Sequence, residues 1–230
     1  MVADTPDPRF DLEKIPWLKT LDPPGWDVLL ADTRLHQYSS SEVVFLEGDT
    51  ATRLFVVRQG WVKAVKLSAD GREQILDFVG AGRPVNFAPI FAEQPNPATL
   101  IALEDCQLWS ISQQTLLNLL DRYPAMSRLI IKSLAGRLMY AVTLVEDLSL
   151  RSVTARLAKL LLIQIQHTDQ PVIIRRRWAT QAEIAARLGT VPDVINRALR
   201  SLADDGLIEV SRRQIAILDE VGLKALMELE

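Results

Sequence analysis

The chain has 230 residues, of which 48% are hydrophobic and 24% are charged, so it can bury a core, and wholesale disorder is excluded. One cysteine and two histidines exclude an internal disulfide, a four-cysteine zinc site, a self-contained iron–sulfur cluster and most histidine-rich metal sites. No apolar run reaches the about 20 residues that span a bilayer, and the first residues lack a signal-peptide pattern, so we expect a cytoplasmic protein with no membrane partner.

The net charge of −3 is distributed unevenly along the chain. Residues 1–150 carry 14 basic and 19 acidic side chains, whereas residues 151–213 carry 11 basic and 6 acidic ones. Two interpretations are open at this point: random fluctuation, or an acidic front domain joined to a back domain that binds nucleic acid. The sequence motifs described below distinguish between these two interpretations.

Proline residues divide the first 40 residues into short pieces, for which we expect helices near residues 11–18 and 25–33. From residue 42 to residue 111 the pattern changes to short apolar and alternating runs that end at glycine-containing turns. Strands that recur every 8–12 residues or so, with turn signals between them, predict an antiparallel barrel or sandwich.

A helical period begins after Ser112, with a short helix expected at 113–120 and a long one at 124–148. The long helix would span about 38 Å at 1.5 Å per residue. One alternative is a core helix packed on its own barrel. However, its apolar residues follow the spacing of a coiled-coil seam and its few charges lie off that seam, which favours a two-fold homodimer. The predicted dimerisation residues are Ile131, Leu134, Leu138, Ala141, Val145 and Leu148.

The last third of the chain has the pattern of two short helices joined by a tight turn. Thr180 and Glu183 are spaced as a capping box at the start of the first helix, and Gly189 suits its end. Pro192 suits the first turn of the second helix, which we expect over residues 192–202. This is the pattern of a helix-turn-helix, although other helical hairpins share it.

A hairpin follows the second helix. The apolar runs 207–210 and 214–218 flank a polar turn, and a short strand is expected at 172–174, after a helix at 152–164. The helix pair, the hairpin as a wing, and the local positive charge together predict that the chain binds double-stranded DNA.

Several stretches of the sequence resemble the Crp/Fnr family of bacterial transcription regulators, over nearly the whole chain. The resemblance implies an α+β chain with an N-terminal double-stranded β-roll like a cyclic-nucleotide-binding domain, a long dimerisation helix and a C-terminal winged helix-turn-helix. It also implies a homodimer on a near-palindromic promoter site, with RNA polymerase as a partner if the protein is an activator. The matching stretches are 44–49, 54–60, 150–158 and 180–208, and the expected domains are 1–122, 123–150 and 151–230.

By the same resemblance, the residues that read bases lie in the first two turns of the second helix: Pro192, Asp193, Asn196 and Arg197. Arg197 can pair with guanine through two N–H groups, which is worth about 1–3 kcal/mol of discrimination. The alternative for Arg197 is a phosphate contact or a solvated charge. Asp193 can accept from cytosine, whereas Pro192 offers no side-chain donor. The residues expected to contact the DNA backbone are Thr180, Gln181, Arg200, Arg212 and Arg213.

Family members that bind cyclic nucleotides resemble one another in a glycine–glutamate pair and a later arginine, which bind the ribose and the cyclic phosphate. The corresponding positions here are Asn86, Phe87 and Asn96, so both charged groups are missing and we do not expect cAMP to bind. The alternatives are another small effector, apolar or aromatic, or a constitutive protein controlled by its abundance. We expect residues 147–151 to act as a hinge. The predicted effector residues are Val85, Asn86, Phe87, Asn96, Arg137 and Tyr140.

Two other interpretations involve a cofactor or a reaction. A haem-based redox or gas sensor would use His36 or Cys106 as an iron ligand, although a cysteine in an alternating strand is more commonly a core residue. A barrel enzyme of the metal-oxygenase type needs two or three histidines with a carboxylate, and residues 41–111 contain no histidine. We therefore expect a regulator rather than an enzyme, with no catalytic or metal-binding residues and no required cofactor.

Overall fold

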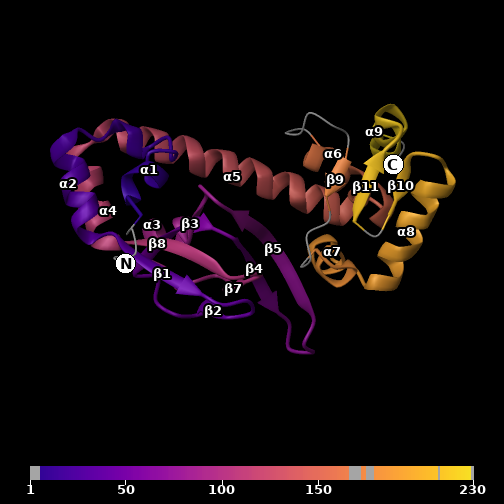
Figure 1. Cartoon of the computed structure of the whole chain (residues 1–230), viewed down its shortest axis with the longest axis horizontal. Coiled ribbons are helices and arrows are strands. Elements are labelled where there is room, and N and C mark those ends of the chain that lie inside the picture. Colours follow the sequence, from indigo (N-terminus) through magenta and orange to yellow (C-terminus); the bar gives the residue numbers. More distant parts are fainter. Residues whose placement is uncertain (1–5, 166–171, 175–178, 212, 229–230) are drawn as a thin grey trace, which may run out of the picture. The chain divides into compact units, whose positions relative to one another are not determined.

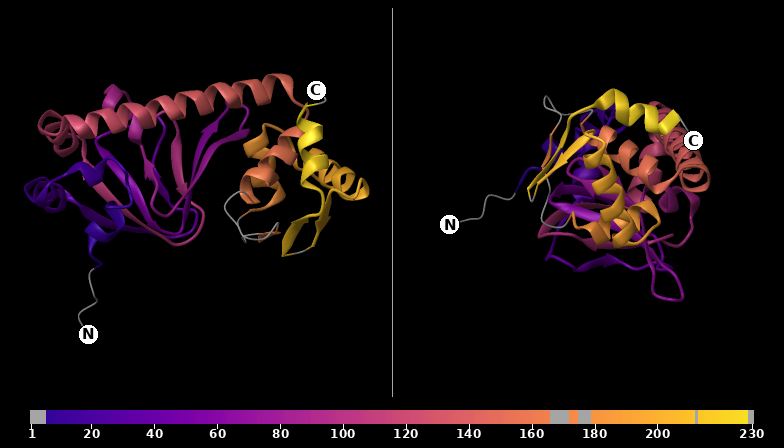
Figure 2. Two further views of the ribbon diagram at one scale, coloured as in Figure 1. Left: turned by 90° about the horizontal axis from the view of Figure 1, so that it is seen from above. Right: turned by 90° about the vertical axis from the view of Figure 1, so that its right-hand side faces the viewer.

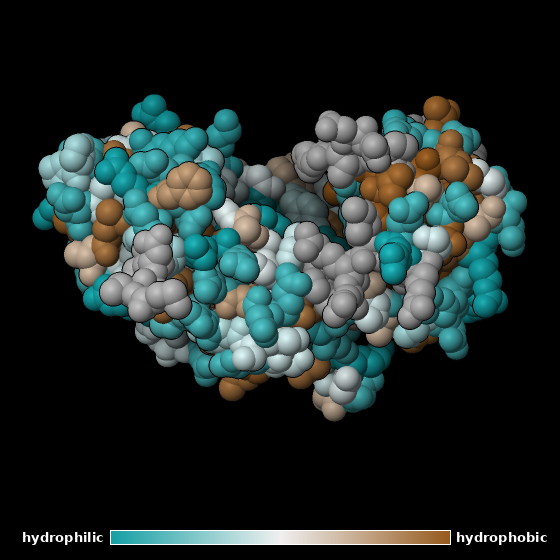
Figure 3. Space-filling model, in the orientation of Figure 1, coloured by the Kyte–Doolittle hydropathy of each residue, from teal (hydrophilic) through white to brown (hydrophobic). Residues whose placement is uncertain are grey.

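The computed structural model describes residues 6–165, 172–174, 179–211 and 213–228, and the chain divides into two compact units (Figure 1). The first unit comprises Met1–Arg72 and Leu76–Leu138, and the second comprises Glu73–Ile75 and Met139–Glu230. None of the described helices is long and apolar enough to cross a membrane. On the face shown in Figure 3, hydrophilic side chains cover most of the first unit, with isolated apolar ones between them.

The first unit begins with two helices and a short turn. The second helix begins two residues before the expected position because Asp22 caps it: the Asp22 carboxylate accepts the backbone N–H of Gly25 at 2.9 Å. The helix expected at 11–18 is wrong, because the first helix ends before Pro16, a residue that lacks the N–H needed inside a helix. The elements are α1 (Pro8–Leu12), a 3₁₀ turn (Leu18–Thr20) and α2 (Pro23–Asp32).

Eight strands follow and form two four-stranded sheets, as expected of a β-roll. The strand orders are β1-β8-β3-β6 and β2-β7-β4-β5, and the paired strands whose register is described are antiparallel. A helix that the sequence did not predict, α3 (Phe87–Ala92), interrupts the strands after β6. The strands are β1 (Arg34–Tyr38), β2 (Val43–Phe45), β3 (Arg53–Gln59), β4 (Trp61–Leu67), β5 (Glu73–Gly80), β6 (Pro84–Val85), β7 (Thr99–Ala102) and β8 (Cys106–Ser112).

The first sheet separates two apolar cores. The register of β3 and β8 pairs Leu54 with Ile111, and both side chains are buried in the core that includes residues of α1 and α2. A pair on the opposite face, Val57 with Leu108, is buried in the core that β4 and β7 also line. Alternate residues of the same strands therefore serve different cores, as the two-residue period of a strand requires.

Helix α4 (Gln113–Arg122) and the first part of α5 (Pro124–Leu150) complete the first unit, and the rest of α5, from Met139, belongs to the second. In α4, Ser112 is the N-cap, and its side chain accepts the backbone N–H of Thr115 at 3.2 Å. The long helix α5 begins at a proline and has 27 residues, which corresponds to about 40 Å at 1.5 Å per residue. Figure 2 shows it as one continuous helix, as the sequence predicted.

The second unit is a set of helices around a three-stranded sheet of order β10-β11-β9. Its core is formed by buried residues of α6, α7, α8 and the sheet. The strand expected at 172–174 is confirmed as β9, whereas no helix was predicted after residue 218. The elements are α6 (Val153–Ile165), β9 (Val172–Ile174), α7 (Gln181–Leu188), α8 (Pro192–Asp204), β10 (Ile208–Val210), β11 (Gln214–Ile217) and α9 (Glu220–Glu228).

Candidate functional site

Helices α7 and α8 form the predicted helix-turn-helix. Thr180 is the N-cap of α7, and its hydroxyl accepts the backbone N–H of Glu183 at 3.2 Å. The helix ends at Gly189, whose φ of 65° lies in the left-handed region that favours glycine. The backbone N–H of Thr190 then donates to the Ala185 carbonyl at 3.0 Å, which fixes the turn into α8.

The outward face of α8 carries most of the predicted base-reading residues. Pro192, Asp193 and Arg197 are exposed, Asn196 is half-buried, and Arg200 is exposed on the same face one turn after Arg197. Within the described part of the chain, the side chains of Arg197 and Arg200 have no hydrogen-bond or ion-pair partner. The opposite face is buried in the core of the second unit, through Ile195, Ala198, Leu199 and Leu202. The helix is therefore fixed by its apolar face and presents free guanidinium groups to solvent.

The wing is a hairpin of β10 and β11. Its turn is closed by the backbone N–H of Ser211, which donates to the Gln214 carbonyl at 2.9 Å. Arg213 is exposed in this turn, whereas the predicted backbone contact Arg212 lies outside the described residues. Thr180 is also exposed and Gln181 is half-buried at the start of α7, where backbone N–H groups suit a phosphate.

The helix α5 carries an apolar stripe, but the stripe differs from the predicted seam. Leu138 and Val145 are 66% and 64% exposed, as expected, and Ile131, Ala141 and Leu148 are exposed too. Leu134 is half-buried and packs against the core of the first unit, so it offers less free surface than the exposed members of the predicted seam. With 3.6 residues per turn, Ala135 and Val142, which lie three residues before and four residues after Leu138, are also in line with it and exposed. We define the apolar stripe as Ile131, Ala135, Leu138, Val142 and Val145, all of which are exposed.

Four of the predicted effector residues are committed to the fold of the first unit. Phe87 is 1% exposed, and its ring packs against Trp17 and Phe91, with centroids 5.7 and 5.0 Å away. Asn86 has a left-handed φ of 64° and donates to the Arg53 carbonyl at 3.1 Å.

Asn96 is 4% exposed and donates to the Leu46 carbonyl at 3.3 Å. Val85 is buried in the core between the two sheets. Among the predicted effector residues, Arg137 is charged and exposed, so its charge remains available to a ligand. Tyr140 is half-exposed and lies on the part of α5 that belongs to the second unit. The structure therefore brings Phe87 and Arg137 together but buries the aromatic face that an apolar effector would need.

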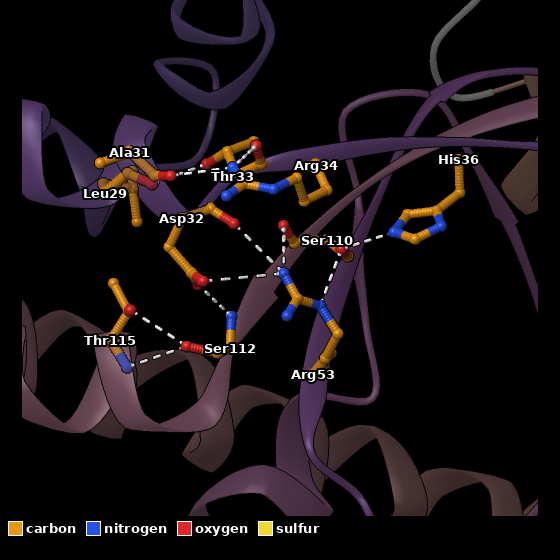
Figure 4. A network of polar contacts seen from close by, with 10 residues as sticks. All are labelled: Leu29, Ala31, Asp32, Thr33, Arg34, His36, Arg53, Ser110, Ser112 and Thr115. Carbon is orange, nitrogen blue, oxygen red and sulfur yellow. Dashed lines mark hydrogen bonds and ion pairs between the residues drawn. The ribbon is translucent and has the colours of Figure 1, made fainter.

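A polar network that the sequence analysis did not single out lies around Ser110 (Figure 4). The fully buried Ser110 hydroxyl contacts the Nε2 of His36 at 2.8 Å and accepts the Nε–H of Arg53 at 2.9 Å. Arg53 also lies 3.9 Å from Asp32, whose carboxylate accepts the Ser112 backbone N–H at 2.6 Å. Burial lowers the pKa of His36, and the positive charge of Arg53 lowers it further. This network joins the end of α2 to β1, β3 and β8.

The two candidate iron ligands do not suit haem. His36 is half-buried, and its Nε2 is already in contact with the Ser110 hydroxyl. Cys106 is 3% exposed, and burial, reinforced by nearby carboxylates, raises the pKa of its thiol to about 11. An iron-ligating cysteine is a thiolate, so the surroundings of Cys106 oppose ligation.

Comparison with known proteins agrees with this architecture. Residues 35–123 match the cyclic nucleotide-binding domain family, and residues 155–226 match the Crp-like helix-turn-helix domain family. The chain is 26% identical over 212 residues to the cyclic AMP receptor protein of Thermus thermophilus, covering 90% of this chain and 96% of the relative. FixK2 from Bradyrhizobium japonicum superimposes with a TM-score of 0.76 at 21% identity, covering 84% of this chain and 96% of FixK2. A CooA mutant from Carboxydothermus hydrogenoformans gives a TM-score of 0.73 at 21% identity, covering 94% and 95%.

Proposed function

Because the chain belongs to the Crp/Fnr family of transcriptional regulators, we propose that it binds a near-palindromic promoter site as a homodimer, under the control of a small effector other than cAMP. The protein is a DNA-binding regulator and not an enzyme. If it is an activator, RNA polymerase is its partner at the promoter. The observation that carries the proposal is the pair of exposed, unpaired guanidinium groups of Arg197 and Arg200 on α8.

The two arginines have different roles in this proposal. Arg197 lies in the second turn of α8, where side chains of a recognition helix reach base edges in the major groove. Arg200 lies one turn further along, where a phosphate contact is the simpler expectation. A two-fold dimer presents two such helices to half-sites about 34 Å apart, which explains a near-palindromic site.

Replacing Arg197 by alanine is expected to remove the preference at one base pair of each half-site, because the bidentate pair with guanine is lost. The expected cost on the preferred site is about 1–3 kcal/mol per half-site. Arg200→Ala, the matched control on the same helix face, should weaken binding to all sequences alike and lower its salt dependence. Gel shifts on a library of randomised half-sites measure both effects. A base preference in Arg197→Ala identical to that of the wild type would exclude the proposed contact.

The proposal of an effector other than cAMP rests on the residues that stand where members of the family that bind cyclic nucleotides have a glutamate and an arginine. The relative from Thermus thermophilus is named for cyclic AMP. By the family resemblance, however, the positions of the glutamate and the arginine are taken here by Phe87 and Asn96, both buried and neither charged. A cyclic phosphate enclosed without a cation is costly. Asn96 is also held in place, because its backbone N–H donates to the Asp49 carbonyl at 2.8 Å and its own carbonyl accepts from Gly48 at 2.9 Å.

A saturating excess of cAMP is therefore expected to leave the DNA affinity of this protein unchanged. The same gel shift, repeated at constant ionic strength with and without the nucleotide, measures this. The Phe87→Glu variant serves as a check on the reasoning, since a carboxylate alone still lacks the cation for the phosphate and should not restore a response. A cAMP-dependent rise in the affinity of the wild type would refute the proposal of a different effector.

A further inference from the structure

Arg137 lies on α5 beside β6, and two contacts within the first unit hold its guanidinium group. Its Nη2 donates to the Pro84 carbonyl at 3.2 Å, and its central carbon lies 5.3 Å from the centroid of the Phe87 ring. An arginine has five N–H donors, and within the described residues the others have no protein acceptor. Because the ring supports one face of the guanidinium, its N–H edges are held ready for a planar acceptor.

Arg83 adds a second positive charge near Arg137. The Nη2 of Arg83 pairs with Asp77 at 2.8 Å, and its Nη1 donates to the Phe78 carbonyl at 2.9 Å. Burial and the charge of Arg83 lower the pKa of Arg137, and Asp77 offsets only part of this effect. Arg137 therefore lies in the positive field of Arg83, which Asp77 offsets only in part, and this field favours a bound anion.

The same contacts argue against an apolar effector at this place. Phe87 is the aromatic residue of the predicted effector set over which Arg137 lies, but its side chain is almost fully buried. Trp17 and Phe91 contact its ring, and Arg137 lies over it. The group that remains available to a ligand is the guanidinium edge, which recognises acceptor oxygens rather than apolar surface.

We propose that Arg137, with Arg83 beside it, binds a small organic carboxylate that acts as the effector of this regulator. A carboxylate has two coplanar oxygens, which match the fork of one guanidinium group. The inference rests on the proposed function because it names the chemical class of the effector. The binding step itself needs no DNA and can be measured separately.

Calorimetric titration of the full-length protein at constant ionic strength tests the site with three probes: succinate, inorganic phosphate and the neutral analogue succinamide. We expect succinate to bind, phosphate to bind more weakly and succinamide not to bind. Arg137→Gln should weaken succinate binding about tenfold or more, and Arg137→Lys should fall between it and the wild type. The matched control Arg128→Gln removes an exposed arginine from the same helix and should leave binding unchanged.

Equal succinate affinity in the wild type and Arg137→Gln would overturn the site, as would the absence of succinate binding. Tighter binding of phosphate than of succinate would overturn the assignment to a carboxylate. The gel shift on randomised half-sites distinguishes a failure of the carboxylate site from a failure of the proposed function. If the protein binds DNA specifically but does not bind succinate, only the proposed carboxylate site is refuted. If it binds succinate but does not bind DNA specifically, only the proposed function is refuted.

Discussion

Replacing Leu138 by glutamate is expected to convert the protein into a monomer and to weaken its binding to a palindromic site about 100-fold or more, because a dimer engages the second half-site at high effective concentration. Leu138 lies at the centre of the apolar stripe and is 66% exposed in the single chain. In a two-fold dimer the stripe faces its own copy. In that dimer the two introduced glutamates would be removed from water without a cation to pair with their charges.

The matched control for this substitution is Ala125→Glu, which adds the same charge to the same helix at an exposed position outside the stripe. It should remain dimeric. Sedimentation velocity measures the oligomeric state, gel shifts measure the affinity, and circular dichroism shows that both variants retain their helices. A Leu138→Glu protein that sediments as a dimer would show that the stripe is not the interface.

The stripe also illustrates how far the sequence could predict the site. The period of apolar residues along α5 correctly indicated an unpaired seam, because Leu138 and Val145 are exposed. The period could not show that the helix has two apolar flanks, of which one packs on the core and the other faces solvent. Leu134 belongs to the first flank and Val142 to the second. Both sets of positions, the predicted seam and the apolar stripe, combine steps of three and four residues, so the period alone cannot show which flank packs on a core, and this is tertiary information.

The recognition helix and the effector region show the two extremes of predictability. The cap at Thr180, the left-handed Gly189 and Pro192 are local signals that depend on backbone sterics, and the structure confirms each of them. Phe87, in contrast, was expected to face an effector and instead fills the core. Asn86 before it has a left-handed φ, a conformation that asparagine permits but does not require, so the sequence could not predict this turn into α3.

The expected hinge at residues 147–151 contains another feature that the sequence did not reveal, a charged cluster within the second unit. Asp147 is 9% exposed and accepts from Lys159 Nζ at 2.7 Å, while the Nε of Arg151 lies 3.0 Å from the same carboxylate. Arg151 also donates to the Met227 carbonyl. The end of α5 is therefore tied to α6 and α9, and the segment is held by charge rather than left free to bend.

Replacing Asp147 by alanine is expected to lower the free energy of unfolding of the second unit by about 3–5 kcal/mol, because Lys159 and Arg151 would keep their positive charges in a largely buried place without a partner. Glu146→Ala is the matched control: this neighbour is exposed and lies 3.5 Å from Arg151, so its loss should cost less than about 1 kcal/mol. Hydrogen exchange of the α6 amides in the full-length protein measures both values for this unit alone. Equal protection of α6 in the two variants would mean that the cluster contributes no more than a surface ion pair. A selective loss in Asp147→Ala would identify Asp147 as the residue that holds the DNA-binding helices to the end of α5.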